Sequence, residues 1–449
     1  MARLASCVAG AALLLLVLLA PLRARAVEVE RVVSPQGIEA WLVEAHAAPF
    51  LTMQFAFRGG TKLDPEGREG LAEFVSALFN EGAGDMDARA FQNALDDNAV
   101  RMSFDAGIDE LDGTLQTLTE RQDRAFELLA LALNAPRFDA DAVERVRAQQ
   151  LAGLERDAKD PRAMAEKLWY RAAFADHPYA RPPEGAPESV RAITVADLRS
   201  WVAARLARDV LAIGVAGDID AATLGPLLDR VFAGLPAHAA PASVAKTVPD
   251  AAGEVLVERM PQPQSLVMWG QRGLARDDPD YYVAYVMNHI LGGGGFTSRL
   301  TEEVREKRGL AYGVYSYLLP LDDAPLLMGG VATQNERVAE SLDIVRAEYA
   351  RLRDGGVSAA ELADAKTYIT GSFALSLDSN REIAGRLVGM QTADLGIDYL
   401  DRRNGLIEAV TVADVGRVAH ALLAPERFTV VVVGDPAGIH PTAAAGGAE

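Results

Sequence analysis

The sequence predicts an α+β protein built from two homologous domains. The chain has 449 residues, which suits about two domains, and half of them are hydrophobic, so two cores can be filled. The segment from Thr194 to Asp218 recurs as Thr411 to Asp435 without a gap, at a constant offset of 217 (411 − 194 and 435 − 218). A repeat of this length indicates a duplicated domain rather than a solenoid of short units.

Each copy of the repeat predicts the same two elements. A Thr with an Asp three residues later caps a helix, and a run of Val, Ile, Leu and Ala then predicts a buried strand. The Ala- and Pro-rich stretch 236–253, PAHAAPASVAKTVPDAAG, has the composition of a linker. We therefore expect domains at 27–235 and 254–449.

The N-terminus has the features of a signal peptide. Arg3 is basic, residues 8–20 form an unbroken apolar run, and Ala24-Arg25-Ala26 fits a small-x-small cleavage site. The run is too short to span a membrane comfortably. We expect residues 1–26 to be removed after Ala26, which predicts a periplasmic protein, with outright secretion less favoured. Cys7, the single cysteine, would leave with this segment, so the mature chain would have no disulfide or thiolate.

The net charge argues against nucleic acid as a partner. The formal charge is −19, whereas nucleic-acid binding requires a basic face. An acidic balance of this kind serves solubility and does not identify a partner.

Alternating and amphipathic segments follow one another along the first domain. Strands are expected in 27–43, as a pair around a turn at 34–37, and in 51–57, 102–108 and 113–118. Helices are expected in 70–82, 88–101, 124–134, 142–156 and 162–174.

The helix expected in 70–82 has two contrasting faces. Apolar residues recur at i, i+3, i+4, i+7 and i+8, which is the pattern of a core-facing stripe. That stripe consists of Leu71, Phe74, Val75, Leu78 and Phe79, and the opposite face carries Glu73, Ser76, Ala77 and Asn80.

The second domain begins with two expected strands and continues as helices and strands. Strands are expected in 254–258, 265–270 and 326–333, and helices in 281–291, 336–354, 359–375 and 381–392.

The most informative stretch of the second domain is 291–318, LGGGGFTSRLTEEVREKRGLAYGVYSYL. After the glycines, Thr297 or Ser298 can cap a helix that runs to about Lys307, and residues 310–318 form a strand pattern. Arg305 then lies in the last helical turn and Tyr312 near the start of the strand. A turn at Gly309 would bring both side chains to the same carbonyl oxygen.

This stretch resembles the second-half signature of the pitrilysin/insulinase family of zinc peptidases, in which an Arg and a Tyr seven positions apart complete the active site. The resemblance covers nearly the whole mature chain. It implies two domains, each a mostly antiparallel sheet packed with helices, which together form half of a clamshell. It also implies that Arg305 and Tyr312 hold substrate and stabilise oxyanion charge.

The same resemblance implies that the zinc motif has been lost. The family carries His-x-x-Glu-His on the first-domain helix, in the context G-x-A-H-F-x-E-H. Aligned on that context, the two histidines become Glu73 and Ala77, and the catalytic Glu becomes Ser76. The third ligand falls near Gly153, although a small gap would shift it toward Glu155. We expect no metal on this chain and zinc in a partner.

The six histidines do not replace the motif. No two of them are closer than 20 residues, so no helical pair of ligands exists.

Structural interpretations stand beside the functional ones. An Arg at the end of a helix interacts favourably with the helix dipole, and a Tyr in a strand is usually packing. The run Gly292, Gly293, Gly294 and Gly295 fits a flexible turn before a capped helix. No Lys-Ser/Thr follows it, which excludes a phosphate loop. A longer glycine-rich loop contacts substrate in the zinc-less subunit of the mitochondrial processing peptidase, so a substrate loop is the second interpretation.

The segment His177-Pro178-Tyr179, with Gly185, matches a loop common in the family. Because Pro and Gly are turn formers first, we interpret it as a structural turn.

Three functions remain open at this point. The preferred one is a non-catalytic subunit of a heterodimeric periplasmic zinc metallopeptidase, which supplies Arg305 and Tyr312 and closes a chamber around an extended peptide. The alternative is a catalytically dead peptide-binding or structural homologue. The weakest is an independent metalloendopeptidase with atypical ligands. No membrane span is expected after signal removal.

Overall fold

The computed structural model describes residues 28–250 and 253–442. The expected signal peptide, the tail beyond 442 and positions 251–252 of the expected linker lie outside this described part. None of its helices is both long and apolar enough to cross a membrane.

The first sheet has six strands in the order β1-β2-β8-β3-β7-β6. Their bounds are β1 Glu30–Val33, β2 Glu39–Glu44, β3 Phe50–Arg58, β6 Arg101–Ala106, β7 Glu110–Leu118 and β8 Leu211–Gly217, with a separate pair of β4 Gly82–Ala83 and β5 Met86–Asp87.

The second sheet has five strands in the order β11-β12-β10-β13-β9. Their bounds are β9 Val255–Arg259, β10 Gln264–Arg272, β11 Ala311–Leu319, β12 Leu326–Gln334 and β13 Thr429–Gly434.

The two sheets have the same topology. Read from one edge, β2-β8-β3-β7-β6 corresponds to β9-β13-β10-β12-β11. In each sheet the first pair is parallel (β2 with β8, β9 with β13) and the others are antiparallel. The predicted α+β fold of two homologous domains, each with a largely antiparallel sheet, is therefore confirmed.

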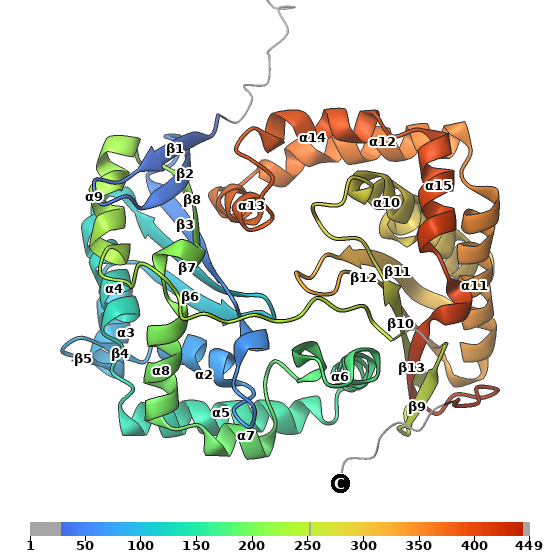
Figure 1. The fold of residues 1–449 in the computed structure, drawn as a ribbon, viewed down its shortest axis with the longest axis horizontal. Coiled ribbons are helices and arrows are strands. Elements are labelled where there is room, and N and C mark those ends of the chain that lie inside the picture. Colours follow the sequence, from blue (N-terminus) through green and yellow to red (C-terminus); the bar gives the residue numbers. More distant parts are fainter. Residues whose placement is uncertain (1–27, 251–252, 443–449) are drawn as a thin grey trace, which may run out of the picture.

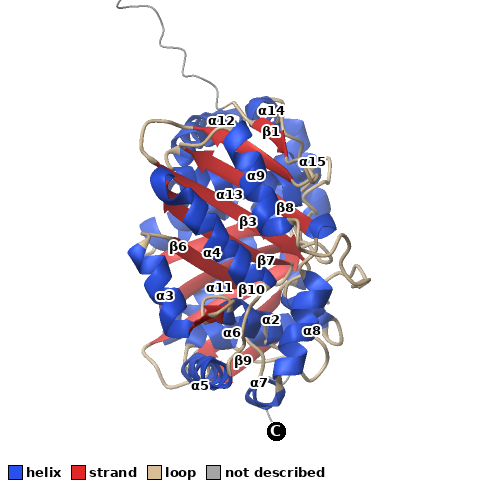
Figure 2. Ribbon diagram, turned by 90° about the vertical axis from the view of Figure 1, so that its left-hand side faces the viewer, coloured by secondary structure: helices blue, strands red, loops and turns tan. Residues whose placement is uncertain are grey.

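Helices cover the outer faces of both sheets (Figure 1), and α4 and α9 lie over β3 and β7 in Figure 2. The first-domain helices are α2 Leu71–Leu78, α3 Ala88–Asp97, α4 Gln122–Asn134, α5 Ala140–Asp157, α6 Pro161–Phe174, α7 Pro187–Ala192, α8 Val195–Arg205 and α9 Ala221–Phe232. The second-domain helices are α10 Tyr281–Asn288, α11 Val338–Gly355, α12 Ala359–Phe373, α13 Asn380–Thr392, α14 Tyr399–Glu408 and α15 Val412–Leu422.

The sequence repeat corresponds to equivalent structure in both domains. Helix α8 begins with a capping box in which Thr194 Oγ1 accepts from the Asp197 amide at 3.2 Å. Helix α15 begins in the same way, with Thr411 Oγ1 and the Asp414 amide 3.1 Å apart. Each helix then leads through a short 3₁₀ turn into a central strand, β8 or β13.

The two domains exchange one helix each across their inner faces. Helix α6 of the first domain lies against the second sheet, and α13 of the second domain lies against the first sheet (Figure 1). The Trp169 indole donates to the Thr429 carbonyl at 2.9 Å, and Gln391 Nε2 donates to the Ile213 carbonyl at 2.8 Å. Neither sheet is thus covered by its own domain alone.

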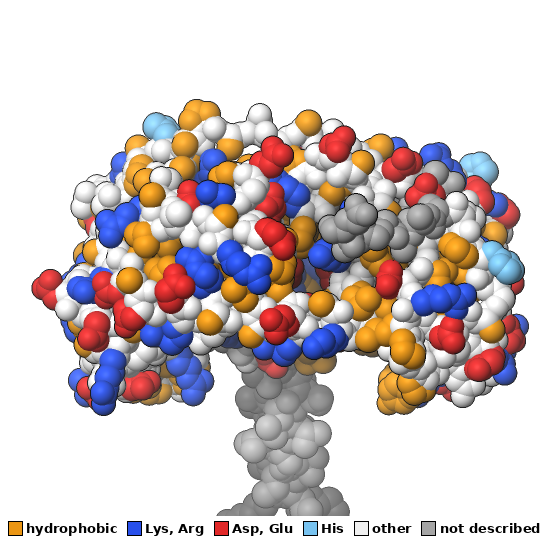
Figure 3. Space-filling view, turned by 90° about the horizontal axis from the view of Figure 1, so that it is seen from below, with side chains coloured by type: hydrophobic (Ala, Val, Ile, Leu, Met, Phe, Trp, Pro, Cys, Tyr) orange, Lys and Arg blue, Asp and Glu red, His pale blue; other side chains and the backbone are white. Residues whose placement is uncertain are grey.

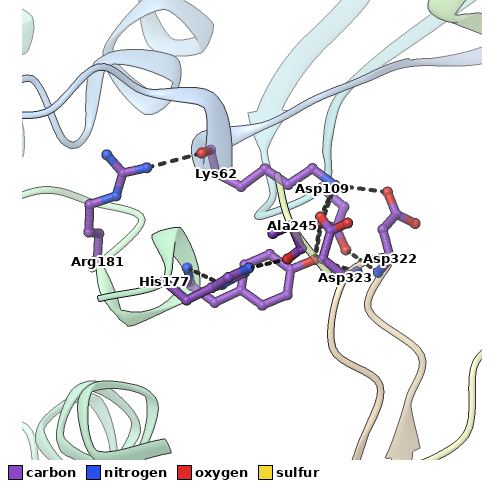
Figure 4. A network of polar contacts seen from close by, with 8 residues as sticks. Lys62, Asp109, His177, Arg181, Ala245, Asp322 and Asp323 are labelled. Carbon is purple, nitrogen blue, oxygen red and sulfur yellow. Dashed lines mark hydrogen bonds and ion pairs between the residues drawn. The ribbon is translucent and has the colours of Figure 1, made fainter. Parts of the chain in front are cut away.

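A polar network also joins the domains (Figure 4). Lys62 Nζ lies 2.9 Å from Asp109 of the first domain, and 3.0 Å and 2.9 Å from Asp322 and Asp323 of the β11–β12 hairpin. Tyr179 Oη donates to Asp109 Oδ1 at 2.7 Å and accepts from the Asp323 amide at 3.0 Å. Burial alone would lower the pKa of Lys62, but the attraction of Asp109 and the bonds to the other carboxylates raise it overall.

The turn predicted at 177–185 belongs to this network. Residues Pro178–Ala180 form a 3₁₀ turn capped by His177, and Tyr179 is buried. Gly185 has φ +82°, and a Cβ there would lie 2.2 Å from the Glu69 carbonyl oxygen. The structural interpretation of this segment therefore accounts for its residues.

Charges of both signs are interspersed over the lower face of the molecule (Figure 3). No continuous basic patch is visible on that face, in keeping with the net charge of −19.

Candidate functional site

Helix α2 is packed as its apolar pattern predicts. Leu71, Phe74, Val75, Leu78 and the following Phe79 are all buried in the core of the first domain. The helix is shorter than the predicted 70–82 and begins after Gly70, whose φ of +88° favours glycine.

The three positions aligned with the zinc motif offer little to a metal. Glu73 is half-buried and Ala77 is exposed. Ser76, expected on the open face, is instead only 4% exposed, and its Oγ donates to the Glu73 carbonyl at 2.8 Å. A short hydroxyl side chain can satisfy itself on the preceding turn of its own helix, which explains this difference.

Acidic groups surround Glu73, the only carboxylate among the three positions aligned with the zinc motif. Burial, followed by the charges of Asp105 and Glu184, raises the pKa of Glu73 to about 7. Burial and the charge of Asp105 likewise raise the pKa of Asp112 to about 6. The inner face of the first domain is thus an acidic wall, made up of Glu73, Asp105 and Asp112.

The third aligned position lies on α5, next to α2. Gln150 of α5 donates from Nε2 to the carbonyls of Gly70 at 3.2 Å and Glu184 at 2.9 Å, which ties α5 to the start of α2. Gly153 itself has no side chain, and a Cβ there would meet the guanidinium of Arg156 at 3.8 Å. The neighbouring Glu155 is exposed.

The donor set therefore does not fit zinc, which takes three or four Cys, His or carboxylate ligands. In residues 28–250 and 253–442, no group of three or more His, Cys, Asp and Glu side chains could hold a metal ion. Histidines in this part are separately engaged: His46 contacts Asp218, His177 contacts the Ala245 carbonyl, His238 contacts Asp209, and His289 stacks on Tyr368.

Arg305 and Tyr312 lie together in the second domain. The Arg305 guanidinium carbon is 4.8 Å from the centre of the Tyr312 ring and 4.6 Å from that of Phe296. Arg305 Nε also lies 3.3 Å from Glu306 Oε1. Phe296, which sequence analysis did not select, completes this Arg-aromatic element. Tyr312 is 87% exposed and Phe296 72% exposed, so both rings are accessible from solvent.

Two irregularities produce this geometry. The pairing of β11 with β12 shifts between Ala311, opposite Thr333, and Val314, opposite Val331, so β11 has one extra residue there. Such a bulge turns a side chain out of the regular sheet, and here it exposes Tyr312. The predicted helix is π-wound over Thr301–Glu306, and Gly309 ends it with φ +59°. Single π turns are frequent at functional sites.

The glycine run has structural reasons at two of its positions. Gly292 lies in a π turn, His289–Gly293, where a Cβ would come within 2.4 Å of Ser316 Oγ and 2.7 Å of the Ser316 amide of β11. Gly295 has φ +59° in open space. These facts agree with the turn interpretation.

Fold and site together define a two-domain peptidase-like chain whose aligned zinc-motif positions do not form a metal site in the described residues. Residues 41–186 match the family model described as insulinase (peptidase family M16), and residues 192–369 match the model described as peptidase M16 inactive domain. The chain therefore belongs to the insulinase (M16) family.

Three relatives illustrate the range of this similarity. A protein named non-peptidase homolog YmxG, from Helicobacter pylori, is 29% identical over 345 residues, which cover 77% of this chain and 79% of that protein. A probable mitochondrial-processing peptidase subunit beta from Schizosaccharomyces pombe is 24% identical over 396 residues, 85% of each chain. The crystal structure of a peptidase M16 inactive domain from Pseudomonas fluorescens matches with a TM-score of 0.86 and 30% identity, over 92% of this chain and 99% of that one.

Proposed function

We propose that this chain is the non-catalytic subunit of a heterodimeric zinc metallopeptidase in the periplasm. The observation that carries the proposal is a contrast between the two halves. The aligned zinc positions hold Glu73, Ser76, Ala77 and Gly153, while Arg305 and Tyr312 lie side by side. A partner of the same family would supply the zinc and the base that activates water.

In this proposal Arg305 and Tyr312 act on a peptide held in the partner's active site. The guanidinium and the phenol would donate hydrogen bonds to the oxygen on which negative charge develops. Removing one such donor typically raises the barrier by about 2.7–4 kcal/mol. Strand β11, which carries Tyr312, is the edge strand of its sheet, so an extended peptide could pair with it.

The name of one relative supports association with a partner chain. One relative is named as a subunit of a processing peptidase, which is the kind of assembly proposed here. The signal-like N-terminus supports the periplasmic location of the mature chain.

The test compares the chain alone with the chain co-expressed with a family member that carries His-x-x-Glu-His. We expect peptide cleavage by the pair and none by the lone chain. Arg305→Ala should lower kcat of the pair about 10²–10³-fold while the two chains still co-purify. Chelator-sensitive cleavage by the lone chain would overturn the proposal, as would unchanged kcat in the Arg305→Ala pair.

A second candidate is a peptide-binding or structural protein without any peptidase role. The name non-peptidase homolog, carried by the Helicobacter pylori relative, favours this candidate. It predicts that Arg305→Ala leaves every activity of the assembly unchanged. The third candidate, an independent metalloendopeptidase, predicts stoichiometric metal in the purified lone chain.

A further inference from the structure

A large aromatic cavity lies in the second domain, lined by residues of α10, α12, α13, α14 and the glycine run. Its volume is about 710 Å³, which lies within the usual range for ligand pockets. Phe296 lines this cavity and also contacts Arg305, so the cavity adjoins the Arg-aromatic element.

Three arginines without a carboxylate partner line this cavity. Arg276, Arg386 and Arg403 line it, and none of them forms an ion pair with a carboxylate in the described part of the chain. Glu382 lines an adjoining hollow with Arg276 and Arg386, yet no ion pair joins it to either. Three cations without a carboxylate partner thus share one cavity in a chain with a formal charge of −19.

The arginines are held by aromatic rings and neutral oxygens instead. Arg276 is 4.2 Å from the centre of the Tyr281 ring and donates to the Tyr282 and Tyr399 hydroxyls at 2.9 Å and 3.1 Å. Its Nη1 is buried and has no hydrogen-bond partner. A buried guanidinium nitrogen without an acceptor carries a desolvation cost.

Arg403 is also held by an aromatic ring and a neutral oxygen, and it is buried in the domain. It is 7% exposed, lies 4.0 Å from the centre of the Phe373 ring, and donates to Asn404 Oδ1 at 3.0 Å. Arg386 approaches the same ring at 5.7 Å and is exposed. Neutral partners hold both cations in place but leave their charges uncompensated.

The cavity rim offers apolar surface that solvent reaches. Three aromatic residues of the lining, Tyr285, Phe296 and Tyr368, are among the exposed large hydrophobic side chains. Exposed aromatics beside unpaired arginines favour a ligand that combines a carboxylate with an apolar body.

In the second domain, this cavity lies at positions that correspond to the zinc-motif positions of the first domain. The segments Leu71–Phe79 and Val283–Leu291, offset by 212 (283 − 71), follow equivalent strands β3 and β10. Their burial patterns coincide: in both nine-residue segments all residues are buried except the third and the seventh.

The third and seventh positions of each segment, which are not buried, are the ones available to a site. In the first segment they are Glu73 and Ala77, where the family has its histidine ligands. In the second they are Tyr285 and His289, and both line the cavity.

The third zinc-ligand position has a counterpart as well. Gly153 follows Asp139, the N-cap of α5, by 14 residues (153 − 139), and Ser372 follows Ser358, the N-cap of α12, by the same 14 (372 − 358). Ser372 lines the cavity. Duplication has thus given this domain a pocket in the position of a catalytic site, lined by arginines and aromatics.

We propose that this pocket binds an acidic segment of a peptide, with a Glu or Asp carboxylate held by Arg276, Arg386 and Arg403 and an apolar neighbour against the aromatic rim. Taking a peptide as the ligand rests on the proposed function.

The test measures fluorescence anisotropy with the mature chain alone, without partner or cleavage. The probes are two fluorescein-labelled decapeptides that differ only in having Glu or Gln on both sides of a central Phe. We expect the Glu peptide to bind at least about tenfold more tightly, since a charge-assisted hydrogen bond contributes about one decade or more in Kd.

Arg386→Gln is the main variant, because Arg386 is exposed and its replacement leaves the core intact. It should weaken the Glu peptide about tenfold and leave the Gln peptide unchanged. Arg386→Lys should restore part of the loss. Arg259→Gln is the matched control, since Arg259 lies on β9 and pairs with Asp435 outside the cavity. It should change neither affinity.

Three results would overturn the proposal: equal affinity for the two peptides, an unchanged preference in Arg386→Gln, or free glutarate binding as tightly as the Glu peptide, which would assign the site to small anions. The proposed function is tested separately. If Arg305→Ala lowers kcat of the pair as expected while the lone chain binds both peptides equally, the subunit role stands and this pocket assignment falls.

Discussion

At the scale of single residues, the two halves differ in what their side chains can still do. Glu73, Ser76 and Ala77 belong to a helix that keeps its packing and has lost its ligands, and Ser76 bonds to its own helix. Arg305 is held between Phe296 and Tyr312 and can still meet a ligand.

Removing the hydroxyl of Tyr312 distinguishes a binding role of this residue from a packing role. Tyr312→Phe keeps the ring against Arg305 and removes the phenol. Because Tyr312 is 87% exposed, the free energy of unfolding should change by less than about 0.5 kcal/mol. If the phenol donates to the developing oxyanion, kcat of the pair should fall about 10²-fold. Urea unfolding and peptide cleavage are the two measurements, and unchanged kcat would assign Tyr312 to packing.

The carboxyl of Glu73 should destabilise the fold at high pH. Its pKa is raised from 4.5 to about 7, first by burial and then by Asp105 and Glu184, so the folded state binds the proton more tightly than the unfolded state. The resulting stabilisation is complete below pH 4.5 and decreases as the pH rises toward 7. Glu73→Gln should therefore raise the free energy of unfolding by about 1–3 kcal/mol at pH 8 and by little at pH 4.

The control for that measurement is Glu66→Gln, because Glu66 is an exposed carboxylate near the same helix. Urea unfolding of both variants at the two pH values checks the prediction. An equal gain at pH 4 and pH 8 would show that burial of the Glu73 charge is not its cause.

At the scale of elements, the glycine run and the bulge of β11 hold the Arg-aromatic element in shape. Gly292 packs directly against the backbone of Ser316 in β11, whereas Gly313 sits in the bulge with nothing within 4 Å of a Cβ built there. The two glycines therefore have different structural roles, although both lie near the Arg-aromatic element.

Gly292→Ala and Gly313→Ala form a matched pair. The first places a Cβ 2.4 Å from Ser316 Oγ and should destabilise the fold by about 1–3 kcal/mol through overpacking. The second meets open space and should change stability by less than about 1 kcal/mol. Thermal or urea unfolding compares them, and equal effects would refute the close approach of the two segments.

Local sequence patterns predicted most helices and strands, but not the contacts between residues of different elements. The apolar stripe of α2, the capped helices α8 and α15 and the strand of Tyr312 followed from periodicity and capping residues, since these signals act over a few residues. The burial of Ser76, the contact of Phe296 with Arg305 and the cavity arginines depend on residues distant in sequence. Only the alignment of Val283–Leu291 with Leu71–Phe79 could have pointed to that cavity beforehand.

At the scale of the whole molecule, the Lys62 network stabilises the contact between the domains. Lys62 is 10% exposed and faces three carboxylates, two of them from the other domain. Removing its charge leaves those carboxylates close together without a cation.

Lys62→Met should lower the free energy of unfolding by about 3–5 kcal/mol, the range for breaking a buried ion pair. Lys307→Met is the control, because Lys307 is 51% exposed and its pairing with Glu302 and Glu303 should contribute less than about 1 kcal/mol. Chemical denaturation measures both. Similar losses in the two variants would show that the network does little for stability.

The exchange of α6 and α13 has a consequence for how the chain is made and broken. Each half leaves part of one sheet face uncovered until the other half has been synthesised, so we expect the first half to complete its folding only after α13 has been made. Because α6 and α13 each pack on the other domain, we expect proteolytic cleavage between 236 and 250 to leave two fragments that stay associated. A denaturant would be needed to separate them.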